Sequence, residues 1–150
     1  MEAARVSPSR SHTETRAYVS HYGGQRRQDW TTPRVMFDAL DREYGFTLDG
    51  ASLRENALLP RFVTGEQILV SWAGERVFCN PPWSRIPEFV ELAAFGDLAV
   101  LLVPARVNAR WFHRALELGA QVKFFLGRPR FGDGKGSSPI DCLLLVFADD

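Results

Sequence analysis

The stretch of sequence that determines the fold is Arg76-Val77-Phe78-Cys79-Asn80-Pro81-Pro82-Trp83. Its first half is a short apolar run, which predicts a buried β-strand. Its second half places an amide, two prolines and an indole directly after that strand. Ligands bind at the carboxyl ends of strands in an open α/β sheet, so residues 80–83 are the first candidates for a binding site.

Residues 80–83 combine hydrogen-bond acceptors with a flat stacking surface. The prolines fix φ and donate no backbone hydrogen bond, so the carbonyl groups of Asn80 and Pro81 can accept one from a ligand. The side-chain oxygen of Asn80 is a further acceptor, and Trp83 offers an aromatic face. This set suits a flipped-out planar base that carries an amino group. An ordinary turn is the competing interpretation, because Pro-Pro pairs and Asn before Pro are common in loops.

On both sides of this strand, apolar runs alternate with stretches of helical periodicity. Helices are expected over residues 33–44, 85–95 and 109–118, and strands over 46–49, 77–79, 98–103, 122–126 and 142–147. The run at 98–103 is continuously apolar, as in a strand that is covered on both faces. The pattern predicts an α/β fold with a doubly wound, mostly parallel sheet of five or six strands. The last two strands are expected to form an antiparallel hairpin at one edge.

The expected helix ends follow from residues that start or stop helices. Thr32 is expected to cap the first helix, with Pro33 at its first helical position, and Ser84 to cap the second. Gly45 is expected to end the first helix in a left-handed conformation. These residues therefore have a structural explanation that needs no ligand.

Composition limits the classes of protein that the chain can belong to. It has 150 residues, of which 45% are hydrophobic and 24% charged, as in one ordinary globular domain. The formal net charge is +0, so any attraction to nucleic acid must come from local patches. Cys79 and Cys142 each lie in an apolar run, which predicts reduced, buried thiols. The three histidines lack the spacing of metal ligands, so no metal site is expected.

The N-terminal residues 1–28 differ from the rest of the chain. They are polar, contain five arginines and show almost no apolar periodicity, which predicts a flexible arm. Its role is open between a disordered terminus and contact with phosphates. The arm lacks the apolar core of a secretory signal, and no stretch approaches the ~20 apolar residues that a membrane helix needs. We therefore expect a cytoplasmic protein with a single domain over residues 29–150.

Six segments in order resemble the phage-type DNA N-6-adenine methyltransferases, which are compact enzymes that depend on S-adenosylmethionine. The similarity covers about residues 29–147. The segments are Asp29-Trp30-Thr31-Thr32-Pro33 before a helix with Phe37 and Leu40; Gly45-Phe46-Thr47-Leu48-Asp49; Glu55-Asn56-Ala57; Val77-Phe78-Cys79-Asn80-Pro81-Pro82-Trp83; Leu101-Leu102-Val103-Pro104-Ala105-Arg106 with Trp111-Phe112-His113; and Phe125-Leu126-Gly127-Arg128 with Phe131-Gly132.

The resemblance implies an abbreviated Rossmann-like methyltransferase fold that methylates the exocyclic amino group of adenine in double-stranded DNA. Asn80, Pro81, Pro82 and Trp83 would form the catalytic loop that receives a flipped adenine. Hydrogen bonds from the amino group to the Asn80 side chain and the Pro81 carbonyl would localise the lone pair of the nitrogen. The nitrogen could then attack the methyl group of the donor in line. The implied setting is the cytoplasm of a bacterial host, with the protein encoded by a phage or prophage.

The resemblance also implies a set of donor-binding residues, namely Trp30, Thr32, Pro33, Asp49, Ala51 and Asn80. Asp49 is the candidate for the methionine ammonium or the ribose, because it ends the expected first strand. It is also a residue type that starts turns. The family usually shows Asp followed by small residues including Ala-Ala, whereas this chain has Asp49-Gly50-Ala51-Ser52. The acidic residue that holds the ribose is therefore unassigned, with Glu66 as one option.

The expected nucleic-acid contacts are Arg106, Arg128, Arg130 and Lys135. Arg106 follows a strand end, where it could reach DNA phosphate or cap the next helix. The loop over 127–136 holds three basic residues against one acidic residue, a net charge of +2, with an aromatic residue between them. A solvated hairpin loop explains it equally well. The chain has no room for a separate target-recognition domain, so sequence reading falls to this loop, the N-terminal arm or a partner in a homodimer.

Other functions stay open at this stage. The same loop chemistry suits any planar amino group, including RNA adenine, the amino group of cytosine and a protein glutamine amide. A non-catalytic nucleic-acid-binding relative is the alternative of a different class. It draws support from the short cofactor region, since only 80 − 49 = 31 positions separate Asp49 from Asn80. That length is too small for two full βα units.

Overall fold

A computed structural model describes residues 32–64, 71–125 and 141–149 of the chain. Its centre is a sheet with the strand order β1-β2-β3-β5-β4. The strands are β1 (Leu48–Asp49), β2 (Arg76–Cys79), β3 (Leu98–Pro104), β4 (Gln121–Lys123) and β5 (Cys142–Ala148). The first three strands are parallel, and β5 runs antiparallel to both β3 and β4. The expected mixed α/β sheet with an antiparallel pair at one edge is confirmed, with β5 inserted between β3 and β4.

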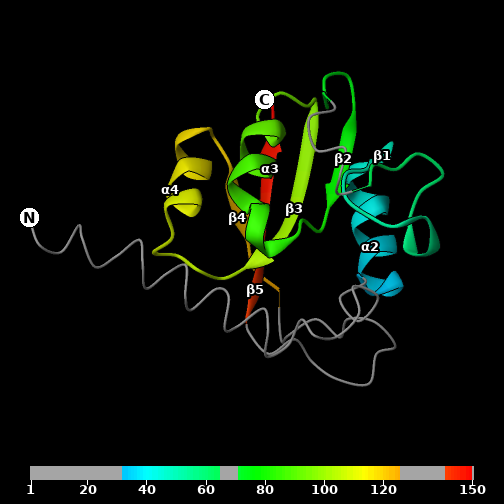
Figure 1. Ribbon diagram of the computed structural model, residues 1–150, viewed down its shortest axis with the longest axis horizontal. Helices are drawn as coiled ribbons and strands as arrows, with labels where there is room; N and C mark the ends of the chain where they lie inside the picture. Colours follow the sequence, from blue (N-terminus) through cyan, green and yellow to red (C-terminus); the bar gives the residue numbers. More distant parts are fainter. Residues whose placement is uncertain (1–31, 65–70, 126–140, 150) are drawn as a thin grey trace, which may run out of the picture.

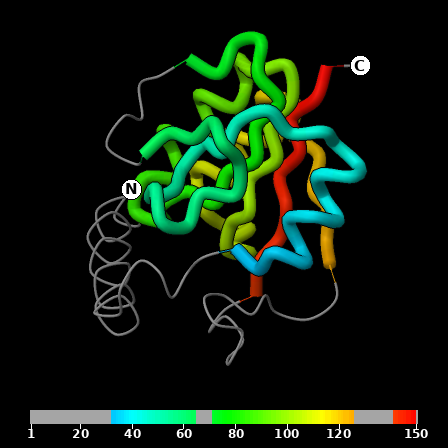
Figure 2. The backbone as a smooth tube through the Cα atoms, turned by 90° about the vertical axis from the view of Figure 1, so that its right-hand side faces the viewer, coloured from blue at the N-terminus to red at the C-terminus, as the bar shows by residue number. Residues whose placement is uncertain are grey.

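Helices cover both faces of this sheet (Figure 1). One face is covered by α2 (Arg34–Tyr44), and the other by α3 (Ile86–Ala93) and α4 (Arg110–Glu117). Figure 2, viewed from the α2 side, shows this helix crossing in front of the C-terminal strand β5. Two short 3-10 helices, η2 (Arg54–Asn56) and η3 (Trp83–Arg85), follow β1 and β2. The three predicted α-helices are therefore present, each shortened by one or two residues at its ends.

Successive strand residues alternate between two apolar layers. The layer under α3 and α4 includes Val77, Cys79, Ala99, Leu101 and Val103, and the layer under α2 includes Phe78, Val100, Leu102, Leu144 and Val146. Every residue of β3 is buried, as its continuous apolar sequence predicts for a strand covered on both faces. This central strand and its neighbours fix the positions of the residues that follow them.

Two of the expected helix caps are wrong. Pro33, expected at the first helical position, is instead the N-cap of α2, one residue after the expected cap Thr32, and no side chain caps the helix. Thr32 lies before this cap, and its hydroxyl contacts another part of the chain. The predicted cap Ser84 lies inside η3, because the Arg85 N–H donates to the carbonyl of Pro82 at 2.9 Å and so forms a tight turn before α3. Gly45 ends α2 as expected, with φ of 65° and its N–H donated to Asp41 O.

The edge strand β1 is supported on both sides despite its length of two residues. It pairs with β2, and on its other side the Asp49 N–H donates to Arg61 O at 3.0 Å. The Val63 N–H donates back to Asp49 O at 2.9 Å. Residues 61–63 thus extend the sheet beyond β1 and complete the backbone hydrogen bonds of Asp49.

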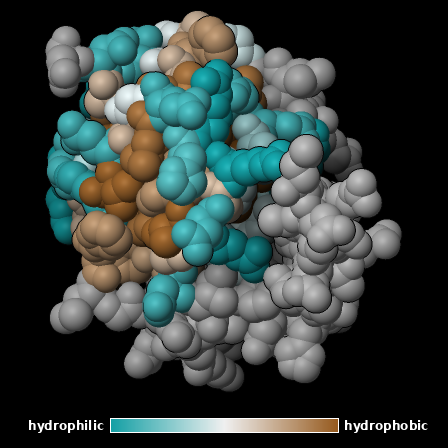
Figure 3. Space-filling view, turned by 90° about the vertical axis from the view of Figure 1, so that its left-hand side faces the viewer, coloured by the Kyte–Doolittle hydropathy of each residue, from teal (hydrophilic) through white to brown (hydrophobic). Residues whose placement is uncertain are grey.

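The surface beside α4 exposes both polar and apolar side chains (Figure 3). On α4 itself, Leu116 is 42% exposed and lies between Arg114 and Glu117, which form an ion pair. Cys79 and Cys142 are buried and form no disulfide, as predicted. Within residues 32–64, 71–125 and 141–149, no helix has the length and apolar character needed to cross a membrane.

Candidate functional site

The carboxyl ends of three neighbouring parallel strands bring the candidate residues together. Asp49 ends β1, Asn80 follows β2, and Arg106 follows β3. The register aligns Asp49 with Phe78 and Cys79 with Leu101, so these strands end at one edge of the sheet. The helices α2, α3 and α4 begin near the same edge, at the bottom of Figure 1. The sequence prediction that ligand-binding groups converge there is consistent with this topology.

The loop of residues 80–83 leads directly from β2 into η3. Pro81 is buried, whereas Asn80, Pro82 and Trp83 are half-buried. The indole of Trp83 contacts both apolar layers of the sheet, which it can do because it lies at the edge where the two layers meet. Trp83 as a whole is half-buried, so it is neither withdrawn into the interior nor loosely attached to the surface.

Thr32 reaches this loop from a distant part of the sequence. Its Oγ1 accepts a hydrogen bond of 3.2 Å from Asn80 Nδ2, although 48 positions separate the two residues. Thr32 is only 5% exposed. Two residues that were predicted to lie at the donor site are therefore in direct contact, through a bond that sequence reasoning did not foresee.

Asp49 is the buried carboxylate of this edge, with 2% exposure. One carboxylate oxygen accepts the Leu58 N–H at 3.0 Å, and the other accepts the Ala51 N–H at 3.3 Å. Burial raises the pKa of Asp49 to about 6, although these backbone hydrogen bonds act in the opposite direction. Asp49 thus orders the chain over residues 51–58 through its side chain. Its bond to Ala51 is the turn-forming pattern proposed for an Asp at this place.

Gly50 is required by its surroundings. A Cβ at this position would lie 2.7 Å from Trp72 Cζ2 and 2.9 Å from Val77 Cγ1. Trp72 is 1% exposed and fills the space next to Gly50. The departure of this chain from the usual family pattern after Asp49 therefore has a packing cause. Sequence reasoning missed Trp72, which stands four positions before the strand in a short segment without clear periodicity.

Two arginines lie where β3 leads into α4. The Arg106 N–H donates to Pro104 O at 2.8 Å, and the Arg106 carbonyl accepts the Ala109 N–H at 3.0 Å, which makes a tight turn before the helix. Arg110 begins α4, is exposed, and forms no ion pair with another residue in the described part of the chain. It was not among the predicted residues, although its place at a helix start after a parallel strand was visible in the sequence.

Several predicted residues lie outside the described parts of the chain. These are Trp30, Glu66, Arg128, Arg130 and Lys135, together with the N-terminal arm. Pro33 and Ala51 are described and half-buried; Pro33 follows Thr32 directly, and Ala51 lies two positions after Asp49. Among residues 32–64, 71–125 and 141–149, no group of three or more His, Cys, Asp or Glu side chains could hold a metal ion.

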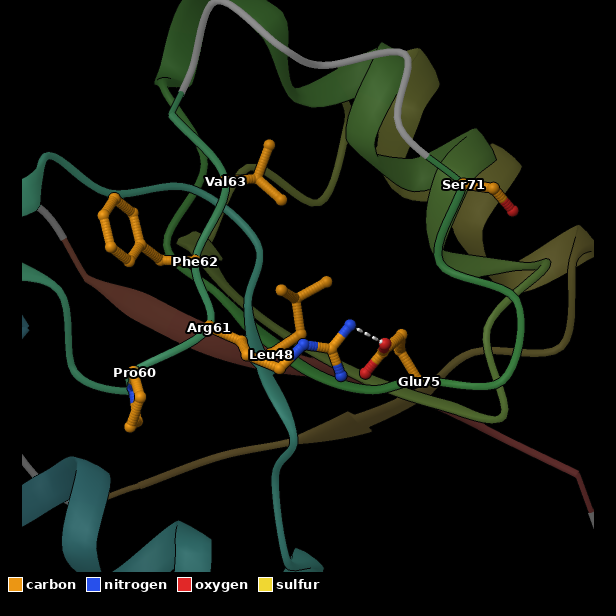
Figure 4. Close-up of a pocket in the computed structure, with 7 residues that line it drawn as sticks. All are labelled: Leu48, Pro60, Arg61, Phe62, Val63, Ser71 and Glu75. Atoms are coloured by element: carbon orange, nitrogen blue, oxygen red, sulfur yellow. Dashed lines mark hydrogen bonds and ion pairs between the residues drawn. The ribbon is translucent and has the colours of Figure 1, made fainter.

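A separate open pocket of about 360 Å³ lies beside β1 (Figure 4). It is lined by Leu48, Pro60, Arg61, Phe62, Val63, Ser71 and Glu75. Arg61 and Glu75 form an ion pair across it, and Thr47 Oγ1 donates to Glu75 at 2.6 Å. The hydrogen bonds from Thr47 and Arg61 lower the pKa of Glu75. None of the predicted site residues lines this pocket, which involves the amino end of β2.

The fold and the site define an α/β protein with polar groups gathered at the carboxyl edge of a mostly parallel sheet. A family model described as DNA N-6-adenine-methyltransferase (Dam) matches residues 19–142, and the chain belongs to this family. The family resemblance seen in the sequence is thereby confirmed, whereas the phage-type subgroup stays a prediction. No curated protein matches the chain. Family membership assigns the protein to the methyltransferases and implies methylation of adenine in DNA.

Proposed function

We propose that the protein transfers a methyl group from S-adenosylmethionine to the exocyclic amino nitrogen of adenine in double-stranded DNA, with residues 80–83 as the catalytic loop. The observation that carries this proposal is the position of Asn80 and Trp83. Both follow β2 directly, at the carboxyl edge of the sheet, in a chain that belongs to an adenine methyltransferase family. The five-stranded α/β sheet supports an abbreviated Rossmann-like fold.

Asn80 and Pro81 act on the nucleophile. The amino nitrogen of adenine is a poor nucleophile, because its lone pair is delocalised into the ring. The Asn80 side-chain oxygen and the Pro81 carbonyl accept hydrogen bonds from this amino group and so localise the lone pair on nitrogen. When bound, S-adenosylmethionine supplies the electrophilic methyl group that the nitrogen attacks. The rate gain comes mainly from orientation and proximity.

Trp83 provides the platform for the target base. A base inside a duplex cannot present its amino group to a methyl donor, so it must flip out of the stack. The half-buried Trp83 packs against both apolar layers, which holds the ring in place. Stacking of a base on such a ring is worth about 1–3 kcal/mol.

Asp49, Thr32 and Asn80 are the described residues that would hold the donor. S-adenosylmethionine carries a cationic ammonium group, which suits the carboxylate of Asp49. Each oxygen of that carboxylate accepts one backbone N–H, and even with the Ser52 side chain as a further hydrogen-bond partner, at least one of its roughly four lone-pair sites is left for a ligand. The donor set therefore fits the cofactor. The proposed donor contacts of Trp30, Pro33 and Ala51 complete the predicted set.

DNA phosphates require positive charge near the loop of residues 80–83. Arg106 and Arg110 lie after β3 at the same edge of the sheet and are our described candidates. Arg128, Arg130 and Lys135 are further proposed contacts in the region between β4 and β5. Such contacts position the duplex without reading its sequence.

The proposal is tested by expression in a bacterial host that lacks adenine methylation, followed by mapping of modified bases in its genome. We expect methylated adenines within one sequence motif. Asn80→Ala should remove the modification, and Asn108→Ala, which deletes the same side chain from an exposed position after β3, should retain it. Methylation found only in RNA, or only on cytosine, would show that the substrate is not adenine in DNA. Donor binding in calorimetry without transfer to any nucleic acid would favour the non-catalytic alternative.

A further inference from the structure

The hydroxyl of Thr32 has an unusual use. A threonine next to the start of a helix commonly accepts a backbone N–H in the first turn. Helix α2 has no side-chain cap, and Thr32 Oγ1 instead accepts a hydrogen bond from Asn80 Nδ2 at 3.2 Å. Thr32 is 5% exposed, so water has little access to this bond from the threonine side. A buried hydroxyl is thus used to hold the amide of the proposed catalytic loop.

The two ends of an Asn side chain are not equivalent. The oxygen only accepts hydrogen bonds, and the NH2 group only donates them. An amino group of a base can bind only to the oxygen end, since two NH2 groups facing each other have no acceptor between them. The torsion that exchanges the two ends is broad and nearly two-fold, so the side chain has little intrinsic preference between them. In the structure the NH2 end of Asn80 donates to Thr32 Oγ1, which turns the oxygen end away from Thr32.

We propose that Thr32 is a positioning residue that keeps the NH2 end of Asn80 turned toward itself and the oxygen end turned toward the amino group of the target base. The inference rests on the proposed function of residues 80–83. It gives Thr32 a role in the chemical step, distinct from the donor contact and from the helix cap that the sequence suggested. Thr32 touches neither the methyl group nor the base in this role; it acts through Asn80.

The role predicts a specific pattern in the kinetics. Thr32→Val keeps the shape of the side chain and removes the acceptor, so the NH2 end of Asn80 loses the hydrogen bond that Thr32 accepts. A neutral hydrogen bond of ordinary strength corresponds to a decrease in kcat of about 2- to 10-fold. Thr32→Ser keeps a hydroxyl and should retain most of the wild-type kcat. The KM for S-adenosylmethionine, measured alongside kcat, reports the proposed donor contact of Thr32 separately from its effect on Asn80.

A second pair of variants separates orientation from simple support. In Asn80→Asp both side-chain oxygens are acceptors, so either orientation can bind the amino group. Thr32→Val should then lower kcat by a smaller factor in the Asn80→Asp background than in the wild-type background. If Thr32 only supported the loop, Thr32→Val would lower kcat by the same factor in both backgrounds. If Asn80→Asp has no activity, the comparison of Thr32→Val with Thr32→Ser decides alone.

Thr47→Val is the matched control. It also removes a hydrogen-bonded hydroxyl, but Thr47 precedes β1 at the opposite edge of the sheet, where it donates to Glu75 at 2.6 Å. We expect its kcat to equal that of the wild type, with melting temperatures recorded for all variants. An equal loss in Thr32→Ser and Thr32→Val, or equal factors in the two backgrounds, would overturn the proposal. A wild-type protein without any transfer would instead overturn the function on which it rests.

Discussion

The amino and carboxyl ends of the parallel strands, called here the amino edge and the carboxyl edge of the sheet, shift the pKa of their carboxylates in opposite directions. At the amino edge, Glu75 is stabilised as a charged group by hydrogen bonds from Thr47 and Arg61, which lower its pKa. At the carboxyl edge, Asp49 is buried, and its pKa is raised to about 6. The amino edge thus pairs its charges with one another, whereas the carboxyl edge keeps a carboxylate where ionisation is costly. Groups held in this second way are frequent at functional sites.

The largest difference between the edges should appear in catalysis. Asn80→Ala removes a hydrogen-bond acceptor from the proposed transition state and should lower the rate of methyl transfer by about 100-fold or more. The affinity for S-adenosylmethionine should fall far less than the rate, because the lost acceptor acts mainly on the base in the transition state. Transfer of a labelled methyl group to duplex DNA measures the first quantity, and calorimetry measures the second. Glu75→Gln, at the amino edge, should transfer at the wild-type rate; equal losses in the two variants would contradict the assignment.

The two carboxylates should affect stability with opposite dependence on pH. For Asp49 the pKa rises from 3.8 to about 6 on folding, so the native state binds more protons within that window. The free energy of unfolding of the wild type, relative to Asp49→Asn, should therefore fall as the pH rises from 3.8 to about 6. A shift of this size corresponds to a loss of about 3 kcal/mol. Chemical unfolding of both proteins across this range provides the measurement.

The comparison of the wild type with Glu75→Gln should show the opposite dependence of the free energy of unfolding on pH. Because the pKa of Glu75 is lowered on folding, its contribution is present above the pKa of the unfolded chain and is lost as the pH falls through the folded value. The advantage of the wild type over Glu75→Gln should shrink in acid. If both differences in the free energy of unfolding changed in the same direction with pH, the contrast between the two edges would be contradicted.

The packing under the carboxyl edge is tested at Gly50. In Gly50→Ala the added Cβ would lie 2.7 Å from Trp72 and 2.9 Å from Val77, so the core must shift. We expect a decrease of about 1–3 kcal/mol in the free energy of unfolding, measured by urea denaturation. Gly96→Ala is the control, since its Cβ would have no neighbour nearer than 3.4 Å. Equal stabilities of the two variants would show that the space beside Trp72 tolerates a methyl group.

The smallest effect should come from the arginines that we propose as DNA contacts. Arg110→Ala removes a positive charge from the carboxyl edge and should weaken DNA binding at low salt. The slope of log Kd against log salt concentration should decrease by about one. Arg114→Ala, one turn later on α4, is the control, because Arg114 is paired with Glu91 at 2.7 Å and with Glu117 at 3.3 Å. An unchanged salt slope in Arg110→Ala would exclude Arg110 from the contact with phosphate.

Much of this arrangement follows from local sequence patterns. The apolar run of β3 and the periodic residues of α2 and α4 define those elements, because each pattern matches the period of one secondary structure. Asn80 and Asp49 could be placed at one edge, since both follow apolar runs that predict parallel strands. Family resemblance then supplied the chemistry for residues 80–83.

The remaining features depend on contacts between distant residues. The bond from Thr32 to Asn80 joins positions 48 apart, and nothing near Thr32 distinguishes it from a helix cap. The requirement for Gly50 arises only when Trp72 packs against it. β1 is shorter than predicted, because the Phe46 N–H donates to the carboxylate of Asp41 at 2.8 Å, before the strand begins. Such features are set by tertiary packing, which local propensity does not encode.

The insertion of β5 has a consequence for how the chain folds during synthesis. β5 pairs with β3 along seven positions and with β4 along three, so it joins the two halves of the sheet. Until residues 142–148 have left the ribosome, β3 and β4 each lack this neighbour and present an open edge. Before β5 emerges, the nascent protein therefore carries exposed strand edges, which leave it open to association with other chains or to capture by a chaperone.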